Sequence, residues 1–485
     1  MGRMNRREFF GGGALAFLSV VCGRAYPAIP GSHDGAGARL KVGVLSDIHI
    51  TVLGDEKAGE LNSPANAKTF IRALERFRDA NVDAVLVSGD LSNDGFIEQL
   101  MAVGDAWRKV FPDGAPSPVK LIIGGNHDWE GWKYGRKGVK RFPDEAELKR
   151  NIICEHLDEA WRSAFGEPFE KVVDREVKGY RFIGAHWPFH VQEAVKYLES
   201  VKGTLPKDRP FFYFQHPPLP GTLQEPRSKK ATVAEILASF PNAVAITGHT
   251  HYSVTDENSI WQGGFTAINA GSLRYTCAPI GRENSGPMRN CGFKQMGNIA
   301  TRDCRQGLMM TVYDDKIVVA RHEHVTDSPL GPDWVVPLDG TRPFDVRRRA
   351  AAAHAPCFPP DAKPVLSDPF EGKRRDGKKS SKVALKFPQA MPSDSAHGRV
   401  LDYRVEVKIK QGGLVNETYM VRRFVAEGFN KPESQMPAEM ECMLDADSIP
   451  HECPLKIEVR AADCYGNLSE PISLATKIKG VVIRW

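Results

Sequence analysis

Five short motifs rich in Asp, His and Asn lie between residues 47 and 251 of the chain. In order they are Asp47-Ile48-His49, Gly89-Asp90, Gly125-Asn126-His127-Asp128, His216 and Gly248-His249-Thr250-His251. Carboxylates, imidazoles and an amide oxygen suit borderline divalent metals such as Zn, Mn or Fe. Two metals about 3.5–4 Å apart can hold both the attacking and the leaving oxygen of a displacement at phosphorus. The motifs therefore indicate a two-metal site, in which any bridging group must be a carboxylate because an imidazole nitrogen has only one free lone pair.

An apolar run precedes each motif. The runs cover residues 40–45, 84–88, 119–123, 210–215 and 243–247. Near-continuous apolar runs of this kind are typical of strands buried on both faces. After the first motif, Phe70, Leu74 and Phe77 recur at helical spacing within residues 65–80. Strands that alternate with helices indicate an α/β fold, in which ligands bind beyond the carboxyl ends of the strands, where every motif lies.

Taken together, the five motifs resemble those of the calcineurin-like metallophosphoesterase family, over residues 40–325. The resemblance implies a catalytic domain at 38–326 with a four-layer α/β/β/α sandwich and two metal ions, each Zn, Mn or Fe. One ion would be held by Asp47, His49 and His251, and the other by Asn126, His216 and His249. Asp90 would bridge the two ions.

The resemblance also implies a mechanism for hydrolysis of a small phosphorylated substrate. A hydroxide shared by both metals is the expected nucleophile, since metal binding lowers the pKa of water from ~15.7 to about 7. His127 would protonate the departing oxygen.

The residues after Asp90 distinguish branches of that family. Asn93 stands where purple acid phosphatases have a Tyr that ligates ferric iron, and where serine/threonine protein phosphatases have an Asp. Asp94 replaces the phosphate-binding Arg of the latter. These departures argue against a ferric site and remove the carboxylate that would orient His127, a role left open for Asp128. The pattern is closer to the bacterial branch that acts on small phosphomonoesters and phosphodiesters.

The C-terminal third has a different pattern. Residues 327–361 contain repeated prolines, which predict a linker without regular structure. Residues 383–387, 403–409 and 455–461 alternate apolar and polar side chains. Period-two strands separated by turns predict an all-β sandwich over 362–485. Residues 461–469 resemble the last hairpin of fibronectin type III-like modules.

The N-terminal residues 1–28 predict an export signal. Arg6 and Arg7 precede an apolar stretch, residues 11–22, which is too short to span a bilayer. The pair resembles the signal that the bacterial twin-arginine translocase reads, which places the mature protein in the periplasm or outside the cell. Lipidation of Cys22 is disfavoured because Val21 before it is large. No transmembrane segment is expected, and the net charge of +5 calls for no nucleic-acid partner.

Two other functions stay open at this point. The first is a phosphodiesterase or pyrophosphatase acting on nucleotides or nucleotide-sugars with the same metal chemistry. The second is an inert protein that binds a surface through its C-terminal domain. Among the remaining histidines, His186 and His190 are expected to pack rather than to line the substrate mouth, whereas His322 and His324 are expected at the surface.

Overall fold

The computed structural model describes residues 37–51, 65–134, 139–140, 142–223, 232–278, 299–301, 304–373, 378–392, 399–411, 415–451 and 453–478. The predicted export signal, with Arg6, Arg7 and Cys22, lies outside these residues. Among the helices that are described, none has the length and apolar character needed to cross a membrane.

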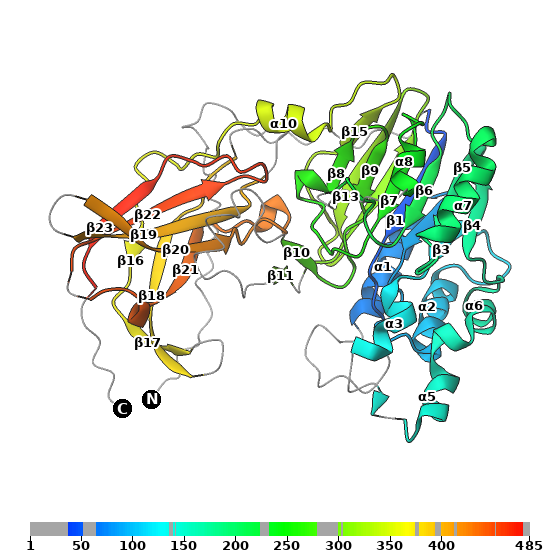
Figure 1. Cartoon of the computed structure of the whole chain (residues 1–485), viewed down its shortest axis with the longest axis horizontal. Helices are drawn as coiled ribbons and strands as arrows, with labels where there is room; N and C mark the ends of the chain where they lie inside the picture. Colours follow the sequence, from blue (N-terminus) through cyan, green and yellow to red (C-terminus); the bar gives the residue numbers. More distant parts are fainter. Residues whose placement is uncertain are drawn as a thin grey trace, which may run out of the picture.

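The first sheet has seven strands and mixed directions (Figure 1). Its path runs through β14 (Ser328–Pro329), β13 (Lys316–Glu323), β12 (Gln306–Val312), β1 (Leu40–Leu45), β2 (Ala84–Ser88) and β3 (Val119–Ile123), and β15 (Trp334–Pro337) pairs with β13. Strands β1, β2 and β3 are parallel to one another. Their carboxyl ends therefore meet at one edge of the sheet.

The second sheet has six strands in the order β4 (Val172–Val177), β5 (Tyr180–Ala185), β6 (Phe212–Gln215), β7 (Val244–Thr247), β9 (Thr266–Asn269) and β8 (Ile260–Gln262). The four strands β5, β6, β7 and β9 are parallel to their neighbours. They bring a second set of strand ends to one edge.

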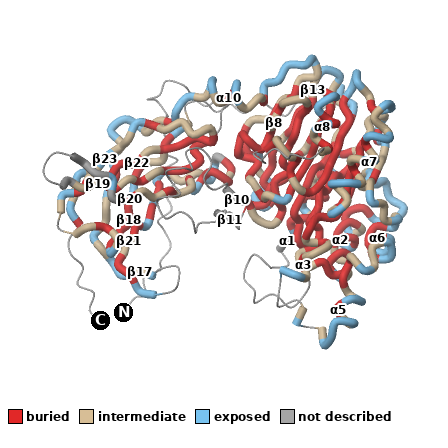
Figure 2. Tube along the Cα trace, in the orientation of Figure 1, coloured by how far each residue is buried: buried red, intermediate tan, exposed pale blue. Residues whose placement is uncertain are grey.

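Three apolar cores contain side chains of these sheets. Figure 2 shows that buried residues follow the strands. One core combines side chains of both sheets, such as Val42 of β1 and Phe214 of β6. A second joins the first sheet to α1 (Ala65–Asp79), α2 (Ile97–Val110) and α6 (Leu157–Phe165). A third joins the second sheet to α7 (Gln192–Val201) and α8 (Val233–Leu237). The helices α3 (Asn126–Tyr134) and α5 (Glu145–Asn151) and the pair β10 (Thr276–Ala278) and β11 (Ile299–Thr301) complete this part.

The proline-rich stretch is more regular than its composition predicts. It contributes β14 and β15 to the first sheet and forms the helix α10 (Val346–Ala352). Pro337 ends β15, which lies on the outer side of β13. Proline is tolerated on an edge strand, because no further strand needs its missing N–H group. The expectation of an irregular linker was therefore wrong for these segments.

The C-terminal region is rich in strands and all its pairings between strands are antiparallel among the described residues. One sheet holds β16 (Val365–Leu366), β18 (Lys379–Pro388), β17 (Phe370–Lys373) and β21 (Glu439–Asp445). The other holds β20 (Val415–Val425), β19 (Asp402–Gln411), β22 (Leu455–Ala462) and β23 (Ile472–Thr476). A single apolar core draws on both sheets, from Leu385 of β18 to Val405 of β19.

Buried amide groups connect this region to the rest of the chain. Asn258 Nδ2 donates to the carbonyl of Cys464 at 3.0 Å. Gln306 Nε2 donates to the carbonyl of Asn430 at 3.0 Å. The Oε1 atom of the same Gln306 accepts from the backbone N–H of Val254 at 2.9 Å. The C-terminal region is thus bonded to the segment that follows the last histidine motif.

Candidate metal centre

The predicted site residues meet where parallel strands of both sheets end. Asp47 and His49 follow β1, Asp90 follows β2, and Asn126 begins α3 after β3. From the second sheet, His216 follows β6 directly, and His249 and His251 follow β7. The topology therefore delivers every one of these side chains to the same place.

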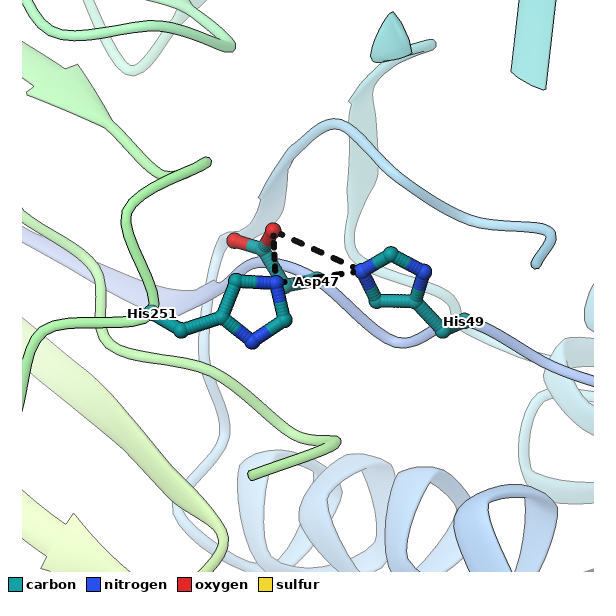
Figure 3. A group of neighbouring side chains, drawn as sticks. All are labelled: Asp47, His49 and His251. Atoms are coloured by element: carbon teal, nitrogen blue, oxygen red, sulfur yellow. Dashed lines mark hydrogen bonds and ion pairs between the residues drawn. The ribbon is translucent and has the colours of Figure 1, made fainter. Parts of the chain in front are cut away.

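Asp47, His49 and His251 form the first group (Figure 3). His251 Nε2 lies 3.1 Å from Asp47 Oδ1, and His49 Nε2 lies 3.7 Å from the same oxygen. The two Nε2 atoms are 3.2 Å apart. All three residues are buried, so their ligand atoms converge in a place shielded from water.

Asp90, His216 and His249 form the second group. His216 Nε2 is 3.0 Å from Asp90 Oδ2 and 3.3 Å from His249 Nδ1. The amide oxygen Oδ1 of Asn126 is 2.9 Å from His249 Nδ1. Asp90 and His216 are buried, whereas His249 is exposed and gives the site its open side.

Asp90 connects the two groups. Its Oδ2 atom lies 3.4 Å from His49 Nε2 and 3.0 Å from His216 Nε2. Its Oδ1 atom accepts the backbone N–H of His127 at 2.8 Å, which fixes the carboxylate in this position. The Asp and His clusters could thus bind a centre of two metals with one carboxylate between them.

Backbone carbonyls fix which nitrogen each histidine presents. A carbonyl oxygen only accepts, so Nδ1 of His216 must donate to Ser88 O at 2.9 Å. His251 Nδ1 likewise donates to Tyr275 O at 3.1 Å and lies 3.0 Å from Ser272 Oγ. Nε2 is therefore the nitrogen of each ring that faces a carboxylate oxygen, and it is the atom that could bind a metal ion once it carries no proton.

Five of the candidate ligands adopt left-handed backbone conformations. Their φ angles are 53° at Asp47, 49° at His49, 53° at Asp90, 70° at His249 and 53° at His251. Each such residue costs about 1 kcal/mol or more and persists only where its surroundings hold it. Here the backbone N–H of His49 donates to Asp90 O at 2.9 Å, and that of His249 donates to Asp47 Oδ2 at 3.0 Å.

Two glycines allow the loops to approach this closely. A Cβ atom on Gly125 would lie 2.3 Å from Asp90 Oδ1, and one on Gly248 would lie 1.8 Å from Ser46 Oγ. Any larger residue would therefore push the ligand-bearing loops apart.

Burial and mutual charge set the protonation of the site. Burial opposes the charged form of Asp90, but His216, His49 and His127 together outweigh it and hold the pKa of the carboxyl well below its usual range. Burial lowers the pKa of His49 well below its usual value and, together with His216, lowers the pKa of His249 to about 4. His216 differs, because Asp90, Asp47 and the Ser88 carbonyl together outweigh burial and raise its pKa to about 9. A cation bound there would displace that proton.

The family model described as calcineurin-like phosphoesterase matches residues 40–253. These residues form a calcineurin-like phosphoesterase domain. The match contains every motif from Asp47 to His251 and ends before β12 and the C-terminal strands.

Comparison with solved structures finds distant likenesses. A dimetal phosphatase from Danio rerio is 12% identical with a TM-score of 0.35, and the likeness covers 62% of this chain and 99% of that one. A Vps29 from Entamoeba histolytica, complexed with zinc, is 12% identical with a TM-score of 0.26, covering 61% and 99%. Likenesses at this level carry no argument about activity. No curated protein matches the chain.

His127 of the phosphoesterase domain lies beside the two groups of candidate ligands, and the main chain of Asn93 orients its ring. Its Nδ1 atom donates to the backbone carbonyl of Asn93 at 2.7 Å. Its ring meets that of His49 edge-on, with centroids 4.5 Å apart. Asp128 does not hold the imidazole, because its carboxylate accepts the backbone N–H groups of Ser92 at 2.8 Å and Gly125 at 2.7 Å. The carboxylate absent at position 93 is thus replaced by the main chain of the same residue.

The motif analysis did not single out Arg274. It follows β9, and its Nη1 atom donates to the side-chain oxygen of Asn93. The next residue, Tyr275, stacks on His251 with ring centroids 4.4 Å apart. The only sequence signal was its position shortly after the apolar run that forms β9.

Three further histidines allow the expected burial to be compared with the structure. His186 packs as predicted, fully buried, with Nδ1 accepting the backbone N–H of Gly124 at 2.9 Å. His322 and His324 were expected at the surface but are 6% and 4% exposed. The ring of His324 lies against Phe77 of α1, with centroids 6.1 Å apart, so this helix covers the end of β13.

Proposed function

We propose that the chain is an exported, metal-dependent phosphoesterase that hydrolyses small phosphate esters. The supporting observation is the position of Asp90, whose Oδ2 atom lies within 3.4 Å of one histidine group and 3.0 Å of the other. A carboxylate between two imidazole groups is the arrangement that a pair of cations needs. The phosphoesterase match at residues 40–253 supports the same chemistry.

The residues would act as follows. Two cations (Zn, Mn or Fe) bound between these groups would supply an activated water and hold the oxygens of the phosphoryl group. The ligands proposed for them are Asp47, His49, Asp90, Asn126, His216, His249 and His251. His127 acts as the general acid: Asn93 O holds its Nδ1–H, so Nε2 is the nitrogen that gives a proton to the leaving oxygen.

Two alternative functions remain to be compared with this one. The first uses the same metal-binding residues, and the second needs none of them. A phosphodiesterase or pyrophosphatase would share the metal groups and differ in the substrate that fits beside them. An inert binding protein would have no need of seven buried or strained polar residues at one point, and such an arrangement costs stability. The ligand set therefore favours an enzyme.

The larger architecture is part of the proposal. The core shared by both sheets and the helix-lined cores on either side support a four-layer α/β/β/α arrangement for residues 38–326. The antiparallel sheets with a common core support a β-sandwich, of fibronectin type III-like kind, for residues 362–485.

Metal analysis and turnover test this function. The purified protein is assayed for bound metal and for hydrolysis of p-nitrophenyl phosphate and bis(p-nitrophenyl) phosphate, with a chelated sample as the control. We expect two metals per chain and turnover that the chelator removes. Hydrolysis of the diester alone would favour the phosphodiesterase, and absence of both metal and turnover would favour the binding protein.

Export is tested separately. Replacing both Arg6 and Arg7 by Lys should leave the protein in the cytoplasm, because the twin-arginine receptor reads the guanidinium pair. Fractionation of cells that express either form measures this. Unchanged export of the variant would show that residues 1–28 use another route.

A further inference from the structure

We propose that Tyr134 binds an aromatic group on the leaving alcohol of the substrate, so that the site prefers aryl or nucleoside phosphates over alkyl phosphates. This inference rests on the proposed phosphoesterase function and specifies the substrate class of the same site. Three observations carry it: the position of Tyr134 on α3, its contact with His127 and its exposure.

Helix α3 brings Tyr134 to the proposed acid. The helix follows β3 (Figure 1), and Asn126 and His127 lie in its first turn. Tyr134 is its last residue, seven positions after His127. Residues seven apart lie on one face of a helix, two turns and about 10 Å along its axis, and long side chains point back towards the helix N-terminus. The ring of Tyr134 is therefore directed towards that of His127.

The two rings are in contact. Their centroids are 5.1 Å apart and their planes are inclined at 56°. The Tyr134 hydroxyl donates to Glu130 Oε2 at 3.2 Å, one helical turn earlier, and this bond fixes the direction of the ring. Tyr134 is nevertheless 55% exposed. The ring thus contacts the proposed acid and still presents free surface to a ligand.

The other two aromatic residues of α3 take part in packing. Trp129 lies against Phe169, with ring centroids 5.8 Å apart. Trp132 packs on the apolar cluster that contains Phe96, and its Nε1 atom donates to the carbonyl of Trp129 at 3.2 Å. Packing therefore accounts for both tryptophans. Of the three aromatic residues on this helix, Tyr134 is the one whose ring is available to a substrate.

The role of His127 determines where the leaving group must lie. A general acid has to lie within about 2.6–3.2 Å of the oxygen that it protonates. Nδ1 of His127 is bonded to Asn93 O, so the ester oxygen must lie at Nε2 of the ring that Tyr134 contacts. The first atoms of the leaving alcohol are then close to the tyrosine ring. An aromatic group there can stack on Tyr134, whereas a short alkyl group cannot.

Tyr134 could influence turnover either by contacting the substrate or by positioning His127, and three esters separate these effects. p-Nitrophenyl phosphate has an aromatic leaving group that departs without a proton. Ethyl phosphate has no ring and needs the proton, and adenosine 5′-monophosphate has a ring and needs the proton. Loss of an aromatic contact should affect the first and third esters, whereas displacement of His127 should affect the second and third.

The test measures kcat/KM on these esters for the metal-loaded protein and for Tyr134→Leu, which keeps an apolar side chain without the ring. We expect a fall of about tenfold on both aromatic esters, mainly through KM, and of less than about threefold on ethyl phosphate, as for loss of one stacked ring. A fall on one aromatic ester alone would support the proposal and show which ring position Tyr134 contacts. Tyr134→Phe is the matched variant, and because it keeps the ring it should retain most of the preference.

Three results would overturn the proposal. They are unchanged rates on both aromatic esters, a fall of the same size on all three esters, and a fall confined to ethyl phosphate and adenosine 5′-monophosphate. The last would show that Tyr134 acts by positioning His127. Metal content is measured in each variant, and loss of metal from Tyr134→Leu would also overturn the proposal.

A binding measurement makes the test independent of turnover. Phenylphosphonate and methylphosphonate contain a carbon–phosphorus bond in place of the ester bond. In calorimetric titrations, the metal-loaded protein should bind phenylphosphonate about tenfold more tightly, and Tyr134→Leu should lose most of this difference. Equal affinities in the unaltered protein would overturn the inference. If that protein hydrolyses none of the esters but retains the preference for phenylphosphonate, the proposed function fails and the aromatic contact of Tyr134 stands.

Discussion

The strand ends of the phosphoesterase domain and the C-terminal sheets use their buried residues in opposite ways. At the strand ends, Asp47, His49, Asp90 and His216 are almost fully buried and face one another. In the C-terminal region an apolar core draws on both sheets, and the buried carboxylate of Asp402 is paired with the guanidinium of Arg423. Buried carboxylates and imidazoles that converge on one point, instead of forming a single pair with a guanidinium, mark a place where a ligand can complete the structure.

Backbone conformation gives the same contrast. Half of the ten non-glycine residues with positive φ among those described are candidate metal ligands. Within the described part of 362–478 no non-glycine residue has a positive φ. Strain is therefore concentrated at the proposed site, and the C-terminal sheets contain regular strands that any alternating sequence can form.

The largest expected effect is at the proposed bridge. Asp90→Ala should lower bound metal and reduce turnover by more than about 10³-fold, since loss of a single charge-stabilising donor already costs about 10²–10³. No neighbouring side chain can replace a carboxylate that reaches both histidine groups. Metal analysis and rates on p-nitrophenyl phosphate measure this, and two metals retained per chain would refute the bridging role.

The next effect separates acid catalysis from metal binding. His127→Ala should keep both metals and lose about 10²–10⁴-fold on an alkyl phosphate. It should lose much less on p-nitrophenyl phosphate, because p-nitrophenolate leaves without a proton. We expect the lower end of the range, since a neutral carbonyl rather than a carboxylate orients the ring. Equal losses on both substrates, or loss of a metal, would show that His127 positions substrate or metal.

A change in the C-terminal core should affect stability alone. The hydroxyl of Tyr403 accepts the backbone N–H of Ala390 at 2.9 Å in a buried position. Tyr403→Phe leaves that N–H without its acceptor and should lower the free energy of unfolding by about 1–3 kcal/mol. Urea unfolding measures the loss, and kcat of the folded protein should not change. A loss of kcat as well would contradict the prediction, because it would show that the C-terminal core affects catalysis as well as stability.

The smallest effect concerns a buried histidine beside the site. Burial lowers the pKa of His186 to about 3, below the unfolded value of about 6.5. The unfolded chain therefore binds the proton first, so this contribution to stability is full above pH 6.5 and declines as pH falls towards 3, by about 1 kcal/mol at pH 5.5. His186→Gln lacks this titration, so its unfolding free energy should fall less between pH 7.5 and 5.5. Parallel curves for the two proteins would contradict this.

The sequence predicts the strand-end residues well because each motif directly follows its strand. Asp47 and His216, for example, lie within two positions of a strand that hydrophobicity alone reveals. Contacts between segments that are far apart in the chain could not be predicted from the sequence. Arg274 meets Asn93 across 181 positions, and the burial of His324 depends on Phe77 of a helix far away in the chain. Composition also failed for residues 327–361, where an edge position lets prolines join a sheet.

The side-chain amide of Gln306 gives the C-terminal region a role in folding. Its oxygen accepts from Ser253 Oγ and Val254 N, both at 2.9 Å, and its nitrogen donates to Asn430 O at 3.0 Å. One end of a single buried group is thus bonded two and three residues after His251, and the other end is bonded to the C-terminal region. A chain cut after residue 361 would lose the acceptor for this nitrogen and for that of Asn258. We therefore expect the two regions to unfold as one cooperative unit, in a single calorimetric transition, even though the sequence divides them with prolines.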